Sequence, residues 1–144
     1  MSNKSLPAWN LMQTAHVVGL RFVEVFAAVG LTPTQFAILM HLDDDEGLTQ
    51  AQLARRVLVR PQSMGTLVTT LLARGFVVRD GPGGRGRRSG VSLTDAGREA
   101  LQRAWPAVRA LNTPTALGLT PAQAAMLDES LTHVRGALSK PTDS

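Results

Sequence analysis

The sequence predicts a mainly α-helical fold in which a helix–turn–helix is followed by a two-stranded hairpin. Three observations predict it. Capping-box sequences mark the starts of several helices, apolar residues recur at helical spacing, and a Gly/Arg-rich loop separates two short apolar runs. With 144 residues, 44% of them hydrophobic, the chain can form a substantial core in one domain or two small lobes.

Threonines mark four helix starts. Thr32, Thr49 and Thr120 are each followed three residues later by glutamine, so the two side chains can satisfy free amides of the first turn. Thr94 precedes Asp95, whose carboxylate suits the positive end of a helix. Together with apolar spacing, these signals predict helices at about 6–29, 33–43, 50–57, 61–74, 95–111 (with a kink expected at Pro106) and 121–138, and strands at 76–79 and 91–93.

The helix predicted at 61–74 has one apolar and one polar face. Its apolar stripe consists of Met64, Leu67, Val68, Leu71 and Leu72, and Gly75 is expected to end it. The polar face carries Gln62, Ser63, Gly65, Thr66, Thr69 and Thr70. Side chains that donate or accept hydrogen bonds without repelling phosphate suit a DNA major groove. An ordinary surface helix is the alternative, but such helices usually carry Glu and Lys, and threonine is a poor helix former.

Basic residues concentrate in the middle of the chain. Residues 55–103 contain ten basic and three acidic residues, a net charge of +7, whereas the remainder has five basic and eight acidic residues, a net charge of −3. This distribution indicates a polyanionic partner, although a solvated arginine-rich surface would also produce it. The candidate DNA-binding residues are Arg55, Arg56, Arg60, Gln62, Ser63, Thr66, Thr69, Thr70, Arg79, Arg85, Arg87 and Arg88.

The loop at 80–90 contains glycines at positions 81, 83 and 86, which match the spacing of a dinucleotide-binding fingerprint. That fingerprint must open a helix whose amides hold the pyrophosphate, whereas a strand-like run follows here. A glycine-rich hairpin that carries three arginines is the simpler interpretation. Arginine can enter a narrow minor groove or bind a phosphate through two nitrogens.

Several segments in combination resemble the MarR family of bacterial transcription regulators: 31–39, Leu53-Ala54, 71–79 and 91–98. The resemblance covers about 10–138. It implies a winged helix-turn-helix DNA-binding domain at 31–103, with 61–74 as recognition helix and 80–90 as wing. It also implies a helical dimerisation region formed by 1–30 and 104–144. The protein would then be a homodimeric, ligand-responsive repressor of a pseudo-palindromic operator, and its effector would be a small aromatic or anionic molecule.

The apolar faces of the terminal helices support a dimer independently, because no sheet is predicted to cover them and a second copy would bury them. The chain also departs from the family pattern. The wing lacks the usual aspartate before its arginines and is one residue shorter. Threonines replace the arginine or aspartate often found in the recognition helix, so phosphate contacts are expected to shift to Arg55, Arg56 and the wing.

No enzymatic activity, metal or cofactor is expected. Cysteine is absent, which excludes disulfides and thiolate metal sites, and His16, His41 and His133 fall on three different predicted helices. Trp9, Met12, His16 and His41 are candidates for an effector pocket between the first helix and the DNA-binding lobe. The alternative for Trp9 and Met12 is a place in the dimer core.

The chain has no 18-residue apolar run and no secretory signal, so a cytoplasmic location is expected, without a membrane partner. Two other functions stay open at this point. A winged-helix protein-interaction module without a DNA role is disfavoured by the charge distribution, and a salt titration would test it. A small-molecule enzyme is disfavoured by the lack of clustered acid and base residues.

Overall fold

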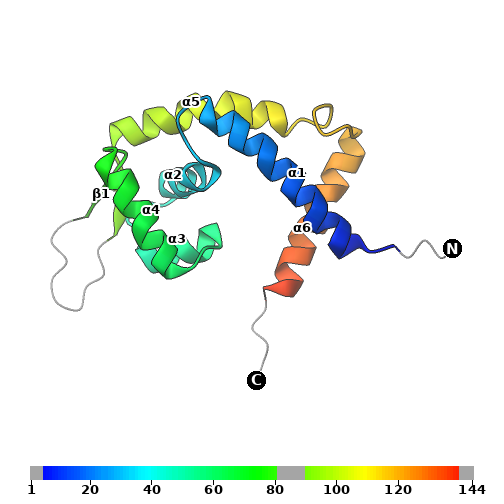
Figure 1. Ribbon diagram of the computed structural model, residues 1–144, viewed down its shortest axis with the longest axis horizontal. Coiled ribbons are helices and arrows are strands. Elements are labelled where there is room, and N and C mark those ends of the chain that lie inside the picture. Colours follow the sequence, from blue (N-terminus) through cyan, green and yellow to red (C-terminus); the bar gives the residue numbers. More distant parts are fainter. Residues whose placement is uncertain (1–4, 81–89, 140–144) are drawn as a thin grey trace, which may run out of the picture. The chain divides into compact units, whose positions relative to one another are not determined.

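The structure is a computed structural model that describes residues 5–80 and 90–139. Within these residues the elements are α1 (Pro7–Ala27), α2 (Pro33–Asp44), α3 (Gln50–Val57), α4 (Pro61–Ala73), β1 (Val77–Arg79), β2 (Val91–Leu93), α5 (Asp95–Leu111) and α6 (Pro121–Leu138) (Figure 1). The predicted mainly α fold is confirmed, and each predicted boundary lies within two residues of the observed one.

The chain divides into two compact units, residues 1–106 and 107–144. The division falls at Pro106, inside α5, and α5 runs through this proline as one helix. The kink expected at Pro106 stays a prediction.

The four threonine caps are confirmed. At the start of α2 the Gln35 amide donates to Thr32 Oγ1 at 3.1 Å, and the Thr32 amide donates to Gln35 Oε1 at 3.0 Å. The starts of α3 and α6 have the same reciprocal pair. At α5 the Gly97 amide donates to Thr94 Oγ1 at 3.0 Å, so Thr94 caps this helix as well. Each such cap stabilises its helix by about 1 kcal/mol.

The end of α4 leads directly into the hairpin. Gly75 adopts φ +75°, a conformation that favours glycine, and its amide donates to the Leu72 carbonyl while the Phe76 amide donates to the Leu71 carbonyl. These two bonds turn the chain out of the helix and into β1. Close to this turn, a Cβ on Gly97 would collide with the Phe76 carbonyl oxygen, so the first turn of α5 packs against the chain here only because residue 97 is glycine.

Strands β1 and β2 form an antiparallel pair in which Val77 faces Leu93 and Arg79 faces Val91. A connection that the sequence did not predict attaches this pair to the segment before α3. The Val91 amide donates to the Leu48 carbonyl at 2.8 Å, and the Gly47 amide donates to the Val91 carbonyl at 3.1 Å. The base of the hairpin is therefore held on both sides, by its own ladder and by the chain that enters α3.

The core of the unit formed by residues 1–106 lies among α2, α3, α4, α5 and the strand pair (Figure 1). Its largest fully buried side chains are Ile38, Leu39, Leu42, Leu53, Met64, Val68, Leu71, Val77, Val91 and Leu101. Burial of such a side chain contributes about 1.5–3 kcal/mol. A row of aromatic rings joins α1 to this core: Phe26 stacks on Phe36 with 4.7 Å between ring centroids, and Phe36 meets Trp105 edge-on at 5.2 Å.

The turn between α3 and α4 contains a strained residue. Leu58 adopts φ 62° and ψ 43°. Among the residues that the structure describes, it is the only non-glycine residue with a positive φ. Its side chain is 70% exposed, so burial offsets little of the conformational cost. A left-handed conformation costs an L-residue about 1–2 kcal/mol, and asparagine adopts it more readily than leucine.

We expect Leu58→Asn to raise the free energy of unfolding by about 0.5–1 kcal/mol, because asparagine tolerates the left-handed backbone. Urea denaturation followed by circular dichroism would measure it. Leu58→Ala is the control, since it removes the exposed side chain but keeps the backbone penalty. A Leu58→Asn protein less stable than Leu58→Ala would contradict the assignment of strain to this turn.

Candidate nucleic-acid interface

Helix α4 presents an uncharged polar face. Met64, Val68 and Leu71 are fully buried in the core. On the opposite side lie the exposed residues Gln62, Ser63, Thr66, Thr69 and Thr70. At 100° per residue these five positions span an arc of about 120°, a stripe that runs along three turns of the helix. The predicted partition of this helix into a core side and a polar side is confirmed.

The hydroxyl groups on this face are not equivalent. Thr69 Oγ1 donates to the Gly65 carbonyl at 2.9 Å, and Thr70 Oγ1 donates to the Thr66 carbonyl at 3.0 Å. The side chains of Gln62, Ser63 and Thr66 make no hydrogen bond with any residue that the structure describes. The sequence predicted that every side chain on this face could donate or accept. The structure limits the free hydrogen-bond donors to the first two turns of the helix. In the third turn, the hydroxyls of Thr69 and Thr70 already donate to backbone carbonyls.

The candidate arginines in residues 55–79 divide into free and paired ones. Arg55 and Arg60 are exposed and have no hydrogen bond or ion pair with the described part of the chain. Arg60 is also the N-cap of α4. Arg56 pairs with Asp45 at 2.6 Å, and Arg79 Nη2 donates to Gln50 Oε1 at 3.0 Å. The wing candidates Arg85, Arg87 and Arg88 lie outside the described residues.

Gln50 holds Arg79 beside α4. The Gln50 side chain lies at the start of α3, and its Nε2 would be 3.3 Å from a Cβ on Gly65 in α4. The same side chain accepts the hydrogen bond from Arg79 in β1. Gln50 therefore bridges the recognition-helix candidate and the hairpin, and a larger side chain at position 65 would press on it. Spacing along the sequence did not predict this contact, because Gln50 and Arg79 are 29 residues apart.

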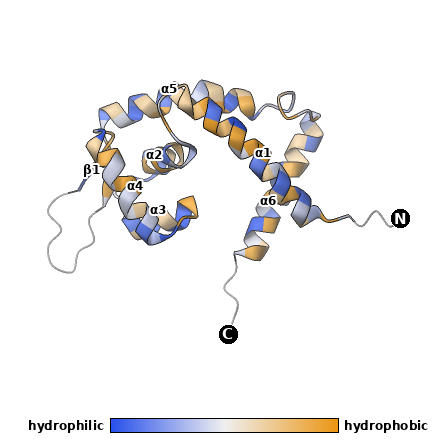
Figure 2. Ribbon diagram, viewed as in Figure 1, coloured by the Kyte–Doolittle hydropathy of each residue, from blue (hydrophilic) through white to orange (hydrophobic). Residues whose placement is uncertain are grey.

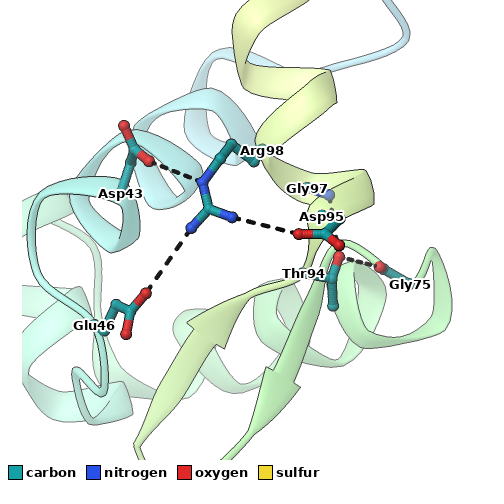
Figure 3. A network of polar contacts seen from close by, with 7 residues as sticks. All are labelled: Asp43, Glu46, Gly75, Thr94, Asp95, Gly97 and Arg98. Atoms are coloured by element: carbon teal, nitrogen blue, oxygen red, sulfur yellow. Dashed lines mark hydrogen bonds and ion pairs between the residues drawn. The ribbon is translucent and has the colours of Figure 1, made fainter.

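Arg98 is a structural residue rather than part of a free basic surface. Its guanidinium faces three carboxylates (Figure 3), with distances of 3.6 Å to Asp43, 3.9 Å to Glu46 and 3.7 Å to Asp95. The Arg98 side chain is 39% exposed, so each pair contributes at most about 1 kcal/mol. Together these pairs join the end of α2 to the first turn of α5, beside the Thr94 cap drawn in the same figure.

Arg74 is also held by the protein. Its Nη1 donates to the Gly30 carbonyl at 2.7 Å and to Gln35 Oε1 at 3.3 Å, and its guanidinium lies 4.5 Å from the centre of the Phe76 ring. The positive charge of residues 55–103 is therefore not all available to a polyanion. Of the described arginines in residues 55–103, Arg56, Arg74, Arg79 and Arg98 have protein partners.

The terminal helices α1 and α6 leave large apolar side chains exposed. Figure 2 shows apolar residues recurring along α1, whose exposed members include Val17, Leu20 and Val23. In α6 no residue is buried, and Met126, Leu127, Val134 and Leu138 are exposed. Apolar surface of this extent is characteristic of an interaction site.

The effector candidates are not brought together by any contact that the structure records. Trp9, Met12 and His16 follow one another at i, i+3 and i+7 on α1, and all three are exposed. His41 lies near the end of α2 and is half-buried. The third histidine, His133, lies 3.7 Å from Glu129 on α6.

Within residues 5–80 and 90–139, no group of three or more histidine, aspartate and glutamate side chains is placed to hold a metal ion. In the same part of the chain no helix combines the length and the apolar character that crossing a membrane requires.

Comparison with known proteins gives a consistent family. A family model described as MarR family matches residues 29–88, which include α2, α3, α4 and β1. The HTH-type transcriptional repressor Rv2887 of Mycobacterium tuberculosis is 38% identical over 103 residues, which are 69% of this chain and 74% of that protein.

Solved structures of MarR-family proteins resemble this chain as well. The crystal structure of Rv2887 in complex with DNA has a TM-score of 0.73 at 27% identity and covers 91% of this chain and 98% of that chain. The complex of Rv2887 with salicylic acid has a TM-score of 0.73 at 28% identity and covers 93% and 99%. The helix–turn–helix, the hairpin at its C-terminal end and these relatives lead to one conclusion: the chain belongs to the MarR family of winged helix-turn-helix transcription regulators.

Proposed function

We propose that the protein is a homodimeric repressor that binds a pseudo-palindromic operator through α4 and the hairpin and is released by a small ligand. In this proposal residues 31–103 form the DNA-binding domain, and residues 1–30 with 104–144 form the dimerisation region. As a regulator of transcription it has no enzymatic role and acts in the cytoplasm. The relative Rv2887 is named a transcriptional repressor and has been crystallised with DNA, which supports the proposal.

The observation that carries the proposal is the division of α4. On its apolar side Met64, Val68 and Leu71 are fully buried, so the core holds the orientation of the helix. Its exposed side has hydrogen-bonding groups and no carboxylate, which is what a helix in the major groove requires. Arg55, Arg56, Arg60 and Arg79, at the ends of α3, α4 and β1, are proposed to contact phosphates, together with the wing arginines Arg85, Arg87 and Arg88.

Base contacts and phosphate contacts should respond differently to substitution. We expect Gln62→Ala and Ser63→Ala to lose about 1–3 kcal/mol on the operator and little on random DNA, because the first turn of a recognition helix reads base edges. Arg60→Ala should weaken both DNAs nearly alike and lower the log–log salt slope by about one unit. Fluorescence anisotropy at several salt concentrations would measure both.

Arg103→Ala is the matched control, since Arg103 is an exposed α5 arginine without a partner among the described residues. It should change the affinity much less than Arg60→Ala. If Gln62→Ala weakens operator and random DNA equally, α4 does not read sequence. If the protein binds neither DNA at low salt, the DNA-binding role itself is wrong, and a protein-interaction module becomes the better interpretation.

The exposed apolar residues of α1 and α6 are the basis for the proposed dimer. Leaving them in water is unfavourable by about 25 cal/mol for each Å² of apolar surface, and a second copy would cover them. Two-fold symmetry would then present two copies of α4 to half-sites one turn of DNA apart, about 34–36 Å.

We expect the protein to sediment as a dimer at micromolar concentration. Leu127→Glu should raise the dimer dissociation constant by about a hundredfold or more, because an unpaired charge would be buried in the interface. Thr132→Glu is the control, since this substitution adds the same charge on the side of α6 opposite Leu127 and Val134. Sedimentation of the unmodified protein as a monomer would overturn the dimer.

An aromatic carboxylate is the proposed effector class. Crystal structures of Rv2887 contain salicylic acid or p-aminosalicylic acid, which supports this class. In this chain Trp9 and Met12 offer apolar contacts, and His16 or His41 could pair with the carboxylate when protonated. A ligand releases DNA only if it binds the free dimer more tightly than the DNA-bound one.

We expect salicylate to quench tryptophan fluorescence and to lower operator affinity over the same concentration range. A tenfold loss of affinity requires about 1.4 kcal/mol of preference for the free form. His16→Gln and His41→Gln would show which histidine contributes, with His133→Gln on α6 as the control. Quenching without any change in operator affinity would show that salicylate binds but does not regulate DNA binding, which would contradict its role as an effector.

A further inference from the structure

We infer that Thr69 and Thr70 read thymine through their methyl groups, so that the operator has thymines opposite the third turn of α4. This inference rests on the proposed function, because it assigns base specificity to a helix proposed to lie in the major groove. Two hydroxyl hydrogen bonds, made by Thr69 and Thr70, divide the exposed face of α4.

Both threonine hydroxyls donate hydrogen bonds to backbone carbonyls of their own helix. Thr69 Oγ1 donates to Gly65 at 2.9 Å and Thr70 Oγ1 donates to Thr66 at 3.0 Å, in each case one turn back along α4. A hydroxyl has a single hydrogen to donate. While these bonds are made, neither side chain can donate to a base or a phosphate. What each still presents is an acceptor oxygen and a methyl group.

The position of Thr69 places it in line with the residues that should read bases. Gln62, Thr66 and Thr69 occupy positions i, i+4 and i+7, so they follow one another along the same stripe of the helix. All three are exposed. Thr70 borders Gln62, Thr66 and Thr69 on the same side as Ser63. The groove-facing stripe therefore changes from free hydrogen-bonding groups at its start to methyl groups in its third turn.

The base edges of the major groove identify the partner of such a surface. Thymine carries a C5 methyl and the O4 acceptor, and adenine and guanine carry the N7 acceptor. A threonine without a free donor cannot satisfy O4 or N7, but its methyl can pack on the thymine methyl. An amino group of adenine or cytosine that donates to the threonine oxygen is the other possibility, and the experiment separates the two.

The experiment uses the full-length protein and an operator selected from random-sequence DNA by the protein itself. Each thymine of the operator is replaced in turn by deoxyuridine, which lacks only the methyl group. We expect each replacement at a contacted thymine to weaken wild-type binding about fourfold, because one pair of packed methyl groups is removed. Thr69→Ser and Thr70→Ser should weaken binding to the thymine operator by a similar factor. They should cause no further weakening on the deoxyuridine operator, because the same pair of methyl groups is already broken there.

Thr69→Val keeps a methyl group and removes the hydroxyl, and its affinity for the thymine operator should stay within about twofold of wild type. Thr132→Ser is the matched control, since Thr132 Oγ1 donates to the Asp128 carbonyl at 2.9 Å on α6 in the same arrangement. It should bind both operators as wild type does. Thermal melting of each variant checks that it is folded, and the deoxyuridine series needs no variant.

Three results would be decisive against the proposals. Failure of the wild-type protein to select any sequence from random DNA would refute the proposed function and not only this inference. Selective binding that is indifferent to deoxyuridine at every position would refute the methyl contact alone. Loss of affinity in Thr69→Val with none in Thr69→Ser would show that the threonine oxygen accepts a hydrogen bond, which also overturns the inference.

Discussion

The hydroxyl of Thr94 joins the elements on which the DNA-binding unit depends. It donates to the Gly75 carbonyl at 2.6 Å and accepts from the Gly97 amide at 3.0 Å, so it links the end of α4 to the start of α5. The hairpin lies between Gly75 and Thr94 in the sequence. Its two strands therefore begin and end at the junction of α4 with α5. Gly97 makes the junction possible because any larger residue would collide with the Phe76 carbonyl. The position of β1 and β2 relative to α4 follows from this junction.

A second constraint is the use of arginine as a structural residue. Arg98 draws Asp43, Glu46 and Asp95 together, and Arg74 donates to the Gly30 carbonyl within the α1–α2 connection. These contacts leave Arg55 and Arg60 as the unpaired cations near the start of α4 within the described residues. The positive charge free to bind a polyanion is thus smaller than the net charge of residues 55–103 suggests. Charge counted along a sequence cannot separate the two roles, because the partners come from other elements.

The local part of the fold was predictable from the sequence. The Thr32, Thr49 and Thr120 caps, the buried stripe of α4 and the Gly75 helix end all depend on residues a few positions apart, and all are confirmed. The Leu48–Val91 bridge and the Gln50–Arg79 hydrogen bond were not predicted, because they join residues far apart in sequence. The back-bonding of Thr69 is local, and the preference of helical threonine for the carbonyl one turn back could have indicated it. For the effector candidates the sequence offered only a spacing on α1.

The connection between α1 and the DNA-binding elements sets what a regulatory ligand must do. The C-terminal end of α1 is held in the core by Phe26, which stacks on Phe36 of α2, whereas its N-terminal half carries the exposed Trp9 and Met12. A displacement of α1 must therefore move Phe26, and because the core is close-packed Phe26 cannot move without α2. Helix α2 packs against α3, and α3 packs against α4. In the proposed dimer, a ligand that shifted α1 would therefore move α4 as part of one packed unit, and a small displacement would suffice because two copies of α4 must match one helical turn of DNA.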